Sequence, residues 1–117
     1  MFEGDNGWIP ALEAKGLHEA KAVRVEVADT SVLIVRGPDD SILAVAARCT
    51  HQGAALDRGV LNLRDSDPTV TCPAHGSIFS LVDGRVRRGP ATQPVQAFDA
   101  RVNDGLVEVR PVPTDAK

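Results

Sequence analysis

Apolar and polar residues alternate along much of this chain with a period of two, which is typical of half-buried β-strands. The clearest case is Ala22–Val27, where valines alternate with Arg24 and Glu26. Two further aliphatic runs, Val32–Val35 and Ile42–Ala46, follow after short polar stretches. Because turn-forming residues separate the three runs, we expect three consecutive strands that form an antiparallel meander.

The strand pattern returns near the C-terminus. Val95–Val102 and Leu106–Val109 are strand candidates, and the Asn-Asp-Gly sequence between them is typical of a hairpin turn. Helix is expected only as a short turn within Ile9–Lys21, because a proline and a glycine interrupt that stretch. The fold class is therefore predicted to be all-β, with an antiparallel β-sandwich or partly open barrel as its base.

Residues 47–80 break this pattern. They contain both cysteines, two of the three histidines and several glycines and prolines. We interpret them as a ligand-bearing subdomain inserted between the strands of the β base. The chain of 117 residues suits one domain with a modest core, so residues 1–117 are expected to form a single domain.

Composition narrows the possible functions. The chain is 43% hydrophobic and 25% charged, which is ordinary for a globular protein. Its net charge of −3 offers no basic surface for nucleic acid, and no apolar run approaches the ~20 residues that span a bilayer. The acidic N-terminal residues lack the apolar stretch of a signal peptide, so we expect a cytoplasmic protein with neither nucleic-acid nor membrane partners.

Two short loops contain the residues that point to chemistry. The first reads Cys49-Thr50-His51-Gln52-Gly53 and the second Cys72-Pro73-Ala74-His75-Gly76. Each supplies one thiolate and one imidazole, and twenty residues separate the two Cys/His motifs. Two cysteines in a cytoplasmic protein are more typical of metal ligands than of a disulfide. The candidate metal ligands are therefore Cys49, His51, Cys72 and His75.

This ligand set fits two kinds of metal group. Two cysteines and two histidines form an ordinary tetrahedral zinc site. The same residues also hold a [2Fe–2S] cluster in which neutral imidazoles replace two thiolates. That replacement leaves the oxidised cluster with its ligands at about zero net charge instead of about −2, which favours the uptake of an electron. The glycines and the proline in the loops favour the cluster over zinc.

These residues give the chain a resemblance to the Rieske ferredoxin family. The matching segments are Cys49–Leu56 and Cys72–Phe79, followed by Asp83–Arg85, Gly89–Ala91 and the C-terminal hairpin. The resemblance covers the chain from Trp8 to Val109. It implies that both cysteines bind one iron and both histidines bind the other iron of a single [2Fe–2S] cofactor. It also implies a fold of three β-sheets with the cluster at one tip.

Residues around the ligands have expected roles as well. Gly53 and Gly76 would let the backbone approach the sulfur atoms and offer N–H groups to them, and Pro73 would stiffen the second loop. Ser77 corresponds to a serine that hydrogen-bonds a bridging sulfide in high-potential relatives, and capping of its own turn is the alternative. Pro90 would close a loop over the cluster or serve as a simple turn residue.

Some positions depart from those relatives. Ala74 stands where the ferredoxins often have tryptophan, and Phe79 stands where high-potential relatives have a tyrosine hydroxyl. The chain also lacks the additional cysteine in each loop that forms a disulfide in cytochrome bc-type relatives. We therefore predict a midpoint potential in the lower part of the Rieske span of roughly −150 to +300 mV. Reduction should be coupled to proton uptake by the histidine rings at alkaline pH.

The sequence offers no catalytic site of its own. A cluster with four protein ligands has no open position for a substrate, and the chain lacks a G-x-G-x-x-G motif for a nucleotide cofactor. With two of the three histidines assigned to the cluster, a 2-His-1-carboxylate iron site cannot be assembled. The chain is therefore expected to be an electron-transfer component and not an enzyme.

The resemblance implies a soluble ferredoxin that carries single electrons from a flavin-dependent reductase to a terminal oxygenase. Two alternatives remain: the small subunit of an assimilatory nitrite reductase, and a zinc-stabilised binding module without a redox role. The net charge of −3 would steer the protein weakly towards a basic surface on its reductase.

Overall fold

The computed structural model describes residues 7–17, 21–27, 29–37, 41–50, 53–64, 67–74 and 76–112. Within these residues the chain forms ten strands and two short 3₁₀ turns, and no helix is long and apolar enough to cross a membrane. The elements are β1 (Ile9–Glu13), η2 (Ala14–Gly16), β2 (Ala22–Val27), β3 (Thr30–Arg36), β4 (Ile42–Ala46), η3 (Leu56–Arg58), β5 (Val60–Asn62), β6 (Thr69–Thr71), β7 (Ile78–Ser80), β8 (Val86–Arg88), β9 (Ala97–Asn103) and β10 (Leu106–Pro111).

The all-β prediction is confirmed, and so is the meander. β2 and β4 have the predicted bounds, and β2, β3 and β4 pair with one another in antiparallel order. The short helical turn expected within Ile9–Lys21 is present at Ala14–Gly16, but the sequence did not predict β1, which Ile9–Glu13 forms against β10. β1 lies at the edge of its sheet, where Pro10 is tolerated because an outward-facing backbone group needs no partner.

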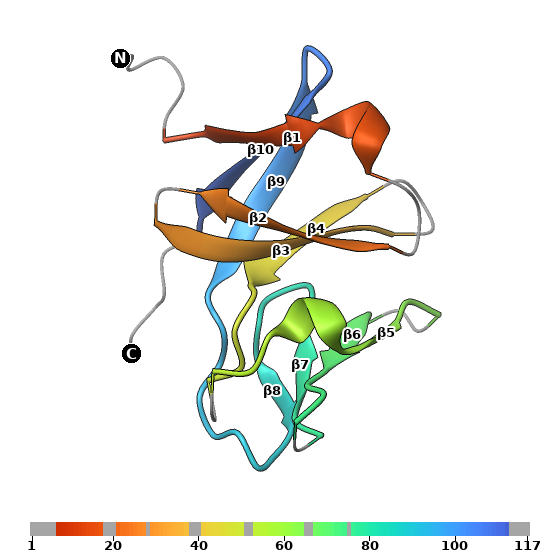
Figure 1. Cartoon of the computed structure of the whole chain (residues 1–117), viewed down its shortest axis with the longest axis vertical. Coiled ribbons are helices and arrows are strands. Elements are labelled where there is room, and N and C mark those ends of the chain that lie inside the picture. Colours follow the sequence, from red (N-terminus) through yellow and green to blue (C-terminus); the bar gives the residue numbers. More distant parts are fainter. Residues whose placement is uncertain are drawn as a thin grey trace.

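The larger sheet has six strands in the order β1-β10-β9-β4-β3-β2 (Figure 1). Its two edge strands, β1 and β2, contact each other, so the sheet curls into the predicted sandwich-like base. The resemblance implied three sheets, but hydrogen bonding gives two in the described residues. The reason is that two residue pairs, Ala44 with Phe98 and Val45 with Ala97, join β4 to β9 and merge the two halves of the base.

β3 separates two hydrophobic cores. Val32 and Ile34 face the core enclosed by the curled sheet, whereas Leu33 and Val35 face the core shared with the smaller sheet. All four side chains are fully buried. A strand that is covered on both faces needs a continuous apolar run, and this explains why β3 lacks the alternation of β2.

The smaller sheet, β5-β6-β7-β8, packs below the base in Figure 1. It spans residues 60–88, so β8 lies beyond the predicted end of the inserted subdomain near residue 80. Three connections extend from these sheets towards the lower end of the molecule. One follows β4, the second joins β6 to β7, and the third joins β8 to β9. The first two contain the candidate ligands.

Candidate metal centre

The first ligand loop, residues 49–54, is closed by two backbone hydrogen bonds. The N–H of Cys49 donates to the carbonyl of Ala54 at 2.9 Å, and the N–H of Gly53 donates to the carbonyl of Cys49 at 2.7 Å. Gly53 has a φ of 74°, a conformation that glycine adopts at little cost. Outside the loop, an isolated antiparallel β-bridge pairs Arg48 with Ala55. The backbone of Cys49 is thereby fixed at the end of β4.

The second ligand loop, residues 72–77, is closed in the same way. The N–H of Cys72 donates to the carbonyl of Ser77 at 2.7 Å, and the N–H of Gly76 donates to the carbonyl of Cys72 at 3.2 Å. Gly76 has a φ of 81°. In both loops the cysteine is the first residue, the glycine the fifth and the terminal acceptor the sixth. The two loops are thus closed by equivalent backbone hydrogen bonds, although their histidines follow the cysteine at different spacings in the sequence.

This closure changes the role of the two glycines. The sequence suggested that Gly53 and Gly76 offer their N–H groups to sulfur, but the structure shows those groups bonded to the cysteine carbonyls. A Cβ atom at either position would have no heavy atom within 4 Å, apart from its chain neighbours. Glycine is therefore required at both places by the positive φ of the loop and not by a close approach of other protein atoms.

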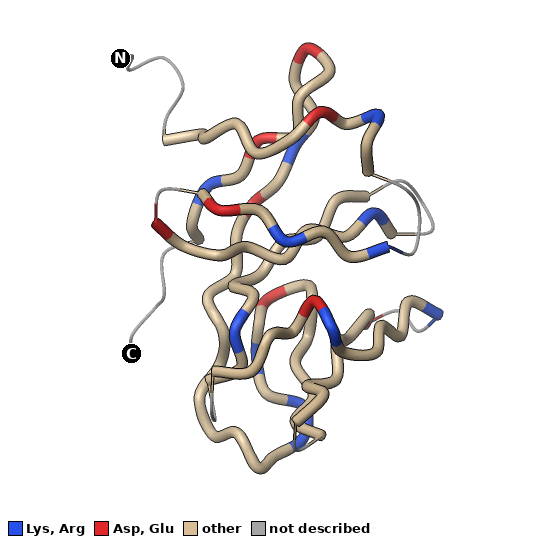
Figure 2. The backbone as a smooth tube through the Cα atoms, in the orientation of Figure 1, with Lys and Arg blue, Asp and Glu red and all other residues tan. Residues whose placement is uncertain are grey.

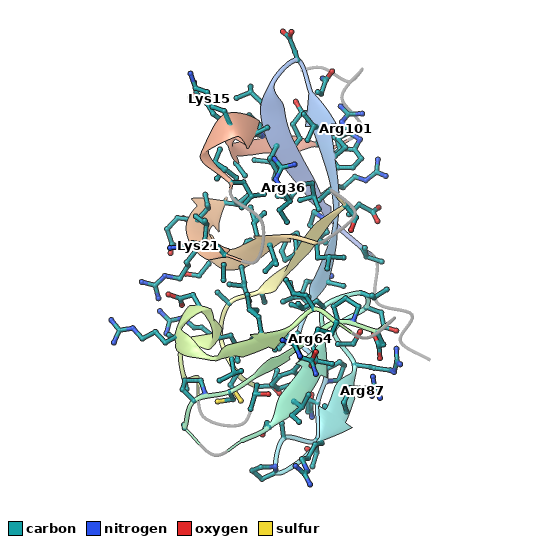
Figure 3. The ribbon with its side chains drawn as sticks, turned by 90° about the vertical axis from the view of Figure 1, so that its right-hand side faces the viewer. Lys15, Lys21, Arg36, Arg64, Arg87 and Arg101 are labelled. Atoms are coloured by element: carbon teal, nitrogen blue, oxygen red, sulfur yellow. The ribbon has the colours of Figure 1, made fainter. Side chains whose placement is uncertain are left out.

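Both cysteines are buried beside one core. Each is 3% exposed, and neither forms a disulfide. They belong to the same apolar cluster as Val70, Phe79 and Leu81, and Figure 3 draws their sulfur atoms in yellow in the lower half of the molecule. Thiolates are the soft ligands that zinc and iron–sulfur clusters select. Two reduced cysteines at equivalent positions of two loops therefore fit a metal group that bridges the loops.

The other two candidate ligands, His51 and His75, lie outside the described residues, as does Gln52. No three histidine, cysteine, aspartate or glutamate side chains gather into a metal-binding group within the part of the chain that the structure describes. The described part of the site is thus its cysteine side.

A third segment connects the two ligand loops. We call residues 89–96, between β8 and β9, the strap. The Thr50 hydroxyl donates to the carbonyl of Gln93 at 2.6 Å, and the N–H of Ala91 donates to the Ser77 hydroxyl oxygen at 3.0 Å. One hydrogen bond thus reaches each ligand loop. Pro90 lies in the strap and is exposed; that it closes a loop over a cluster stays a prediction.

Thr50 and Gln93 were not predicted to be residues of the site. Thr50 stands beside a ligand, but its acceptor is 43 residues away in the chain, and no local pattern relates the two. The signal available in the sequence was the Gly89-Pro90 pair, which marked the strap as a turn next to the site without indicating what it contacts.

The Ser77 hydroxyl has a different role from the turn cap considered as its alternative. Ser77 is 1% exposed, and its oxygen accepts from Ala91, which is 14 residues away, so it ties the second ligand loop to the strap. Its own hydrogen remains able to donate, and no acceptor for it is found among the described residues. Phe79, fully buried nearby in the core, adds no hydroxyl to the site.

The turn after β7 holds a network of charged groups. Asp67 accepts hydrogen bonds from Ser80 at 2.9 Å, from Arg85 at 2.9 Å and from Arg87. Arg85 also donates to Asp83 at 2.7 Å. Burial raises the pKa of Asp83, but hydrogen bonds from Arg85 and its positive charge outweigh burial and hold that pKa below its ordinary value. The basic stretch at residues 85–87 is therefore largely neutralised by neighbouring aspartates.

The chain matches one family model, which describes the Rieske [2Fe-2S] domain and covers residues 7–99. Among curated proteins, Ferredoxin CarAc of Metapseudomonas resinovorans is 30% identical over 102 residues, which is 87% of this chain and 92% of that protein.

Two solved structures show how far the similarity extends. The ferredoxin of carbazole 1,9a-dioxygenase from Nocardioides aromaticivorans IC177 has a TM-score of 0.81 and 27% identity, and the match covers 90% of this chain and 98% of that one. A putative NADH-dependent nitrite reductase small subunit from Mycobacterium tuberculosis has a TM-score of 0.79 and 28% identity, with coverage of 92% and 96%.

Proposed function

The chain belongs to the Rieske [2Fe–2S] domain family, and from this we propose that it is a single-domain electron carrier. It would take single electrons from a flavin-dependent reductase and pass them to a terminal oxygenase. The observation that supports this best is the pair of equivalent loops. Each loop holds one buried cysteine against a shared core, and one strap is bonded to both.

In this proposal Cys49 and Cys72 bind one iron of a [2Fe–2S] cluster, and His51 and His75 bind the other. When bound, the cluster supplies reversible one-electron chemistry. The protein keeps water away from the sulfur side, since both cysteines are 3% exposed and are packed among apolar side chains. Four protein ligands leave no position for a substrate, so catalysis takes place on the partner.

The residues around the ligands set the properties of the site. Gly53 and Gly76 hold the two loops in their positive-φ conformation, and Pro73 stiffens the second loop. Pro90 belongs to the strap that joins the loops. The Ser77 hydroxyl donates a hydrogen bond to the site and favours the reduced, more negative state. With Phe79 in place of a second hydroxyl, the potential lies in the lower part of the family's span.

The partners are inferred from the relatives. The ferredoxin of carbazole 1,9a-dioxygenase, which matches over nearly its whole length, is named as a component of an oxygenase system. The second candidate function, the small subunit of a nitrite reductase, rests on the comparable match to the protein from Mycobacterium tuberculosis. The presence of all four ligand residues favours the electron carrier. We also propose a cytoplasmic location, where a reducing environment keeps both cysteines available as ligands.

The first test asks whether the cluster is present. Protein purified without oxygen should contain two iron and two sulfide per chain and be brown, and dithionite should bleach it. Cys72→Ala and His75→Ala should each lose the iron. A colourless protein with one zinc per chain would overturn the proposal and leave the zinc-stabilised module.

The second test separates the two redox functions. The protein is supplied in catalytic amounts, with NADH and a flavin-dependent reductase as the continuing source of electrons, to an aromatic-ring oxygenase with its substrate. In parallel it is supplied with the same electron source to a haem-containing nitrite reductase and nitrite. Dihydroxylated product that depends on the chain supports the carrier. Nitrite consumption that depends on the chain, without product from the oxygenase, assigns it to nitrite reduction.

A further inference from the structure

Charge is divided unevenly between the two parts of the molecule. Residues 47–95, which contain the ligand loops, the smaller sheet and most of the strap, have six arginines and four aspartates, a net charge of +2. Because the whole chain has a net charge of −3, the remaining residues together carry −5. Figure 2 shows Lys and Arg mixed with Asp and Glu over the upper part, and arginines prevailing in the lower part. The small net charge of the chain thus conceals a net positive segment that contains the ligand loops.

The aspartates described in this positive segment are already paired. Asp67 and Asp83 both bond to Arg85 at the turn end of the smaller sheet. Asp57 lies 3.7 Å from Arg24, which belongs to β2 of the base. Asp67 and Asp83 thus offset positive charge at the end of the sheet away from the ligand loops, and Asp57 faces the base.

Three arginines that lie near the ligand loops, in the chain or in the smaller sheet, have no such partners. Arg48, Arg58 and Arg88 are exposed and have no carboxylate within ion-pair distance among the described residues. Arg48 precedes the first ligand loop and donates to the carbonyl of Gly53 at 3.4 Å. Arg58 ends η3, which follows that loop. Arg88 lies opposite Ile78 at the end of the smaller sheet from which the second ligand loop and the strap extend. We call these three residues the basic rim.

The opposite end of the same sheet provides a contrast. Arg64 follows β5 in the turn of the β5–β6 hairpin, whereas β6 continues into the second ligand loop at its other end. Arg64, labelled in Figure 3, is also exposed and has no carboxylate partner in the described part of the chain. Within the rim, Arg48 shares a surface hollow with Glu26 and Asp29 of the base. The positive charges of Arg58 and Arg88 are therefore less offset by nearby carboxylates than the charge of Arg48.

We propose that the basic rim docks an acidic face of the electron acceptor, the terminal oxygenase, beside the ligand loops. The inference rests on the proposed function, because it takes the ligand loops as the place where electrons leave the protein. Electron-transfer encounters use small, transient interfaces, in which charge acts mainly on the association rate. A net positive segment on a negatively charged molecule also orients the protein, so that an acidic partner meets the loops first. Net charge alone predicts the opposite, a basic partner.

The test uses two small redox probes of opposite charge. Reduced holoprotein is mixed in a stopped-flow instrument with hexacyanoferrate(III) or with hexaammineruthenium(III), each of which accepts one electron from the protein. The readout is the second-order rate constant for hexacyanoferrate(III) divided by that for hexaammineruthenium(III). A variant that shifts the midpoint potential changes the driving force for both probes alike, so the ratio reports local charge. For the wild-type protein the ratio should exceed that of an uncharged site and fall as salt is raised from about 10 mM.

Arg88→Glu and Arg64→Glu form the matched pair, since both reverse one exposed arginine on the same sheet. At about 100 mM ionic strength, where the Debye length is about 10 Å, Arg88→Glu should lower the ratio about threefold or more, and Arg64→Glu no more than about 1.5-fold. Reversal of all three rim arginines should make the protein prefer the cationic probe. Equal effects of the two single variants, or a wild-type preference for the cation, would overturn the proposal. Absence of a reducible cluster would instead refute the proposed function.

Discussion

The replacement Ser77→Ala tests the contact between the second ligand loop and the strap. The Ser77 hydroxyl is 1% exposed and accepts the hydrogen bond of the Ala91 N–H, which is itself buried in the strap. Alanine leaves that N–H without its acceptor, at a cost of about 1–3 kcal/mol. For a domain of this size a loss of 1 kcal/mol lowers Tm by roughly 4 °C. We therefore expect Tm of the variant to fall by roughly 4–12 °C.

The same replacement should change the redox potential. The Ser77 oxygen accepts from Ala91, so its one hydroxyl hydrogen is available to donate to the cluster. A hydrogen bond to a charged acceptor is about twice as strong as one to a neutral acceptor. The reduced state then gains about 0.7–1.4 kcal/mol more than the oxidised state from this hydrogen bond. Because about 1.4 kcal/mol corresponds to about 59 mV for one electron, Ser77→Ala should lower the midpoint potential by about 30–60 mV.

Ser80→Ala is the matched control. Ser80 is equally buried, and its hydroxyl bonds Asp67 and the N–H of Val82, at the end of the sheet away from the ligand loops. Both variants should lose stability in thermal unfolding followed by circular dichroism. In protein-film voltammetry, Ser77→Ala should shift the potential and Ser80→Ala should not. An unchanged potential for Ser77→Ala would refute the donor role, and an equal shift in both would show that the effect is general destabilisation.

Three further outcomes are expected. Gly84→Ala should unfold at much lower urea concentration than Gly105→Ala, because both glycines have φ near +80° but only the Cβ at residue 84 would meet the Val95 carbonyl oxygen, at 2.1 Å; the variants should differ by about 2 kcal/mol or more, and equal midpoints would contradict this. Thr50→Val removes the hydroxyl that bonds the strap, so iron should pass to a chelator severalfold faster, and Thr50→Ser should restore the wild-type rate. The lowered pKa of Asp83 means that its charge stabilises the fold above pH ~4 and that this contribution is lost as the pH falls through the folded-state pKa, so Asp83→Asn should show a shallower fall of Tm between pH 5 and 3 than the wild type.

The parts of this protein that sequence analysis predicted well depend on local properties of the chain. The bounds of β2 and β4 agree with the prediction because alternation and turn residues act over a few positions. β1 was missed because Pro10 argues against regular structure unless the strand lies at a sheet edge, and a position at an edge is not visible in a local pattern.

The candidate site divides along the same line. The sequence by itself determined the two Cys/His loops and the metal chemistry that such residues support, because those ligands lie within a few residues of one another. Only the tertiary structure shows that the two loops are closed by equivalent backbone hydrogen bonds. Every residue has a backbone carbonyl, so the residue types do not reveal which carbonyl accepts. The tertiary structure also decided that the strap joins the loops, through contacts 14 and 43 residues apart.

Charge shows the difference most clearly. From the sequence alone, a net charge of −3 favours a basic partner. Only the fold places Arg88 at the end of the smaller sheet from which the second ligand loop extends, and pairs Asp67 and Asp83 with Arg85 at the other end. A partner at the loops responds mainly to the charges beside them, because salt screens charges that are more than about 10 Å away. Residue types thus determined the chemistry of this protein, and their arrangement in space decided which surface presents it.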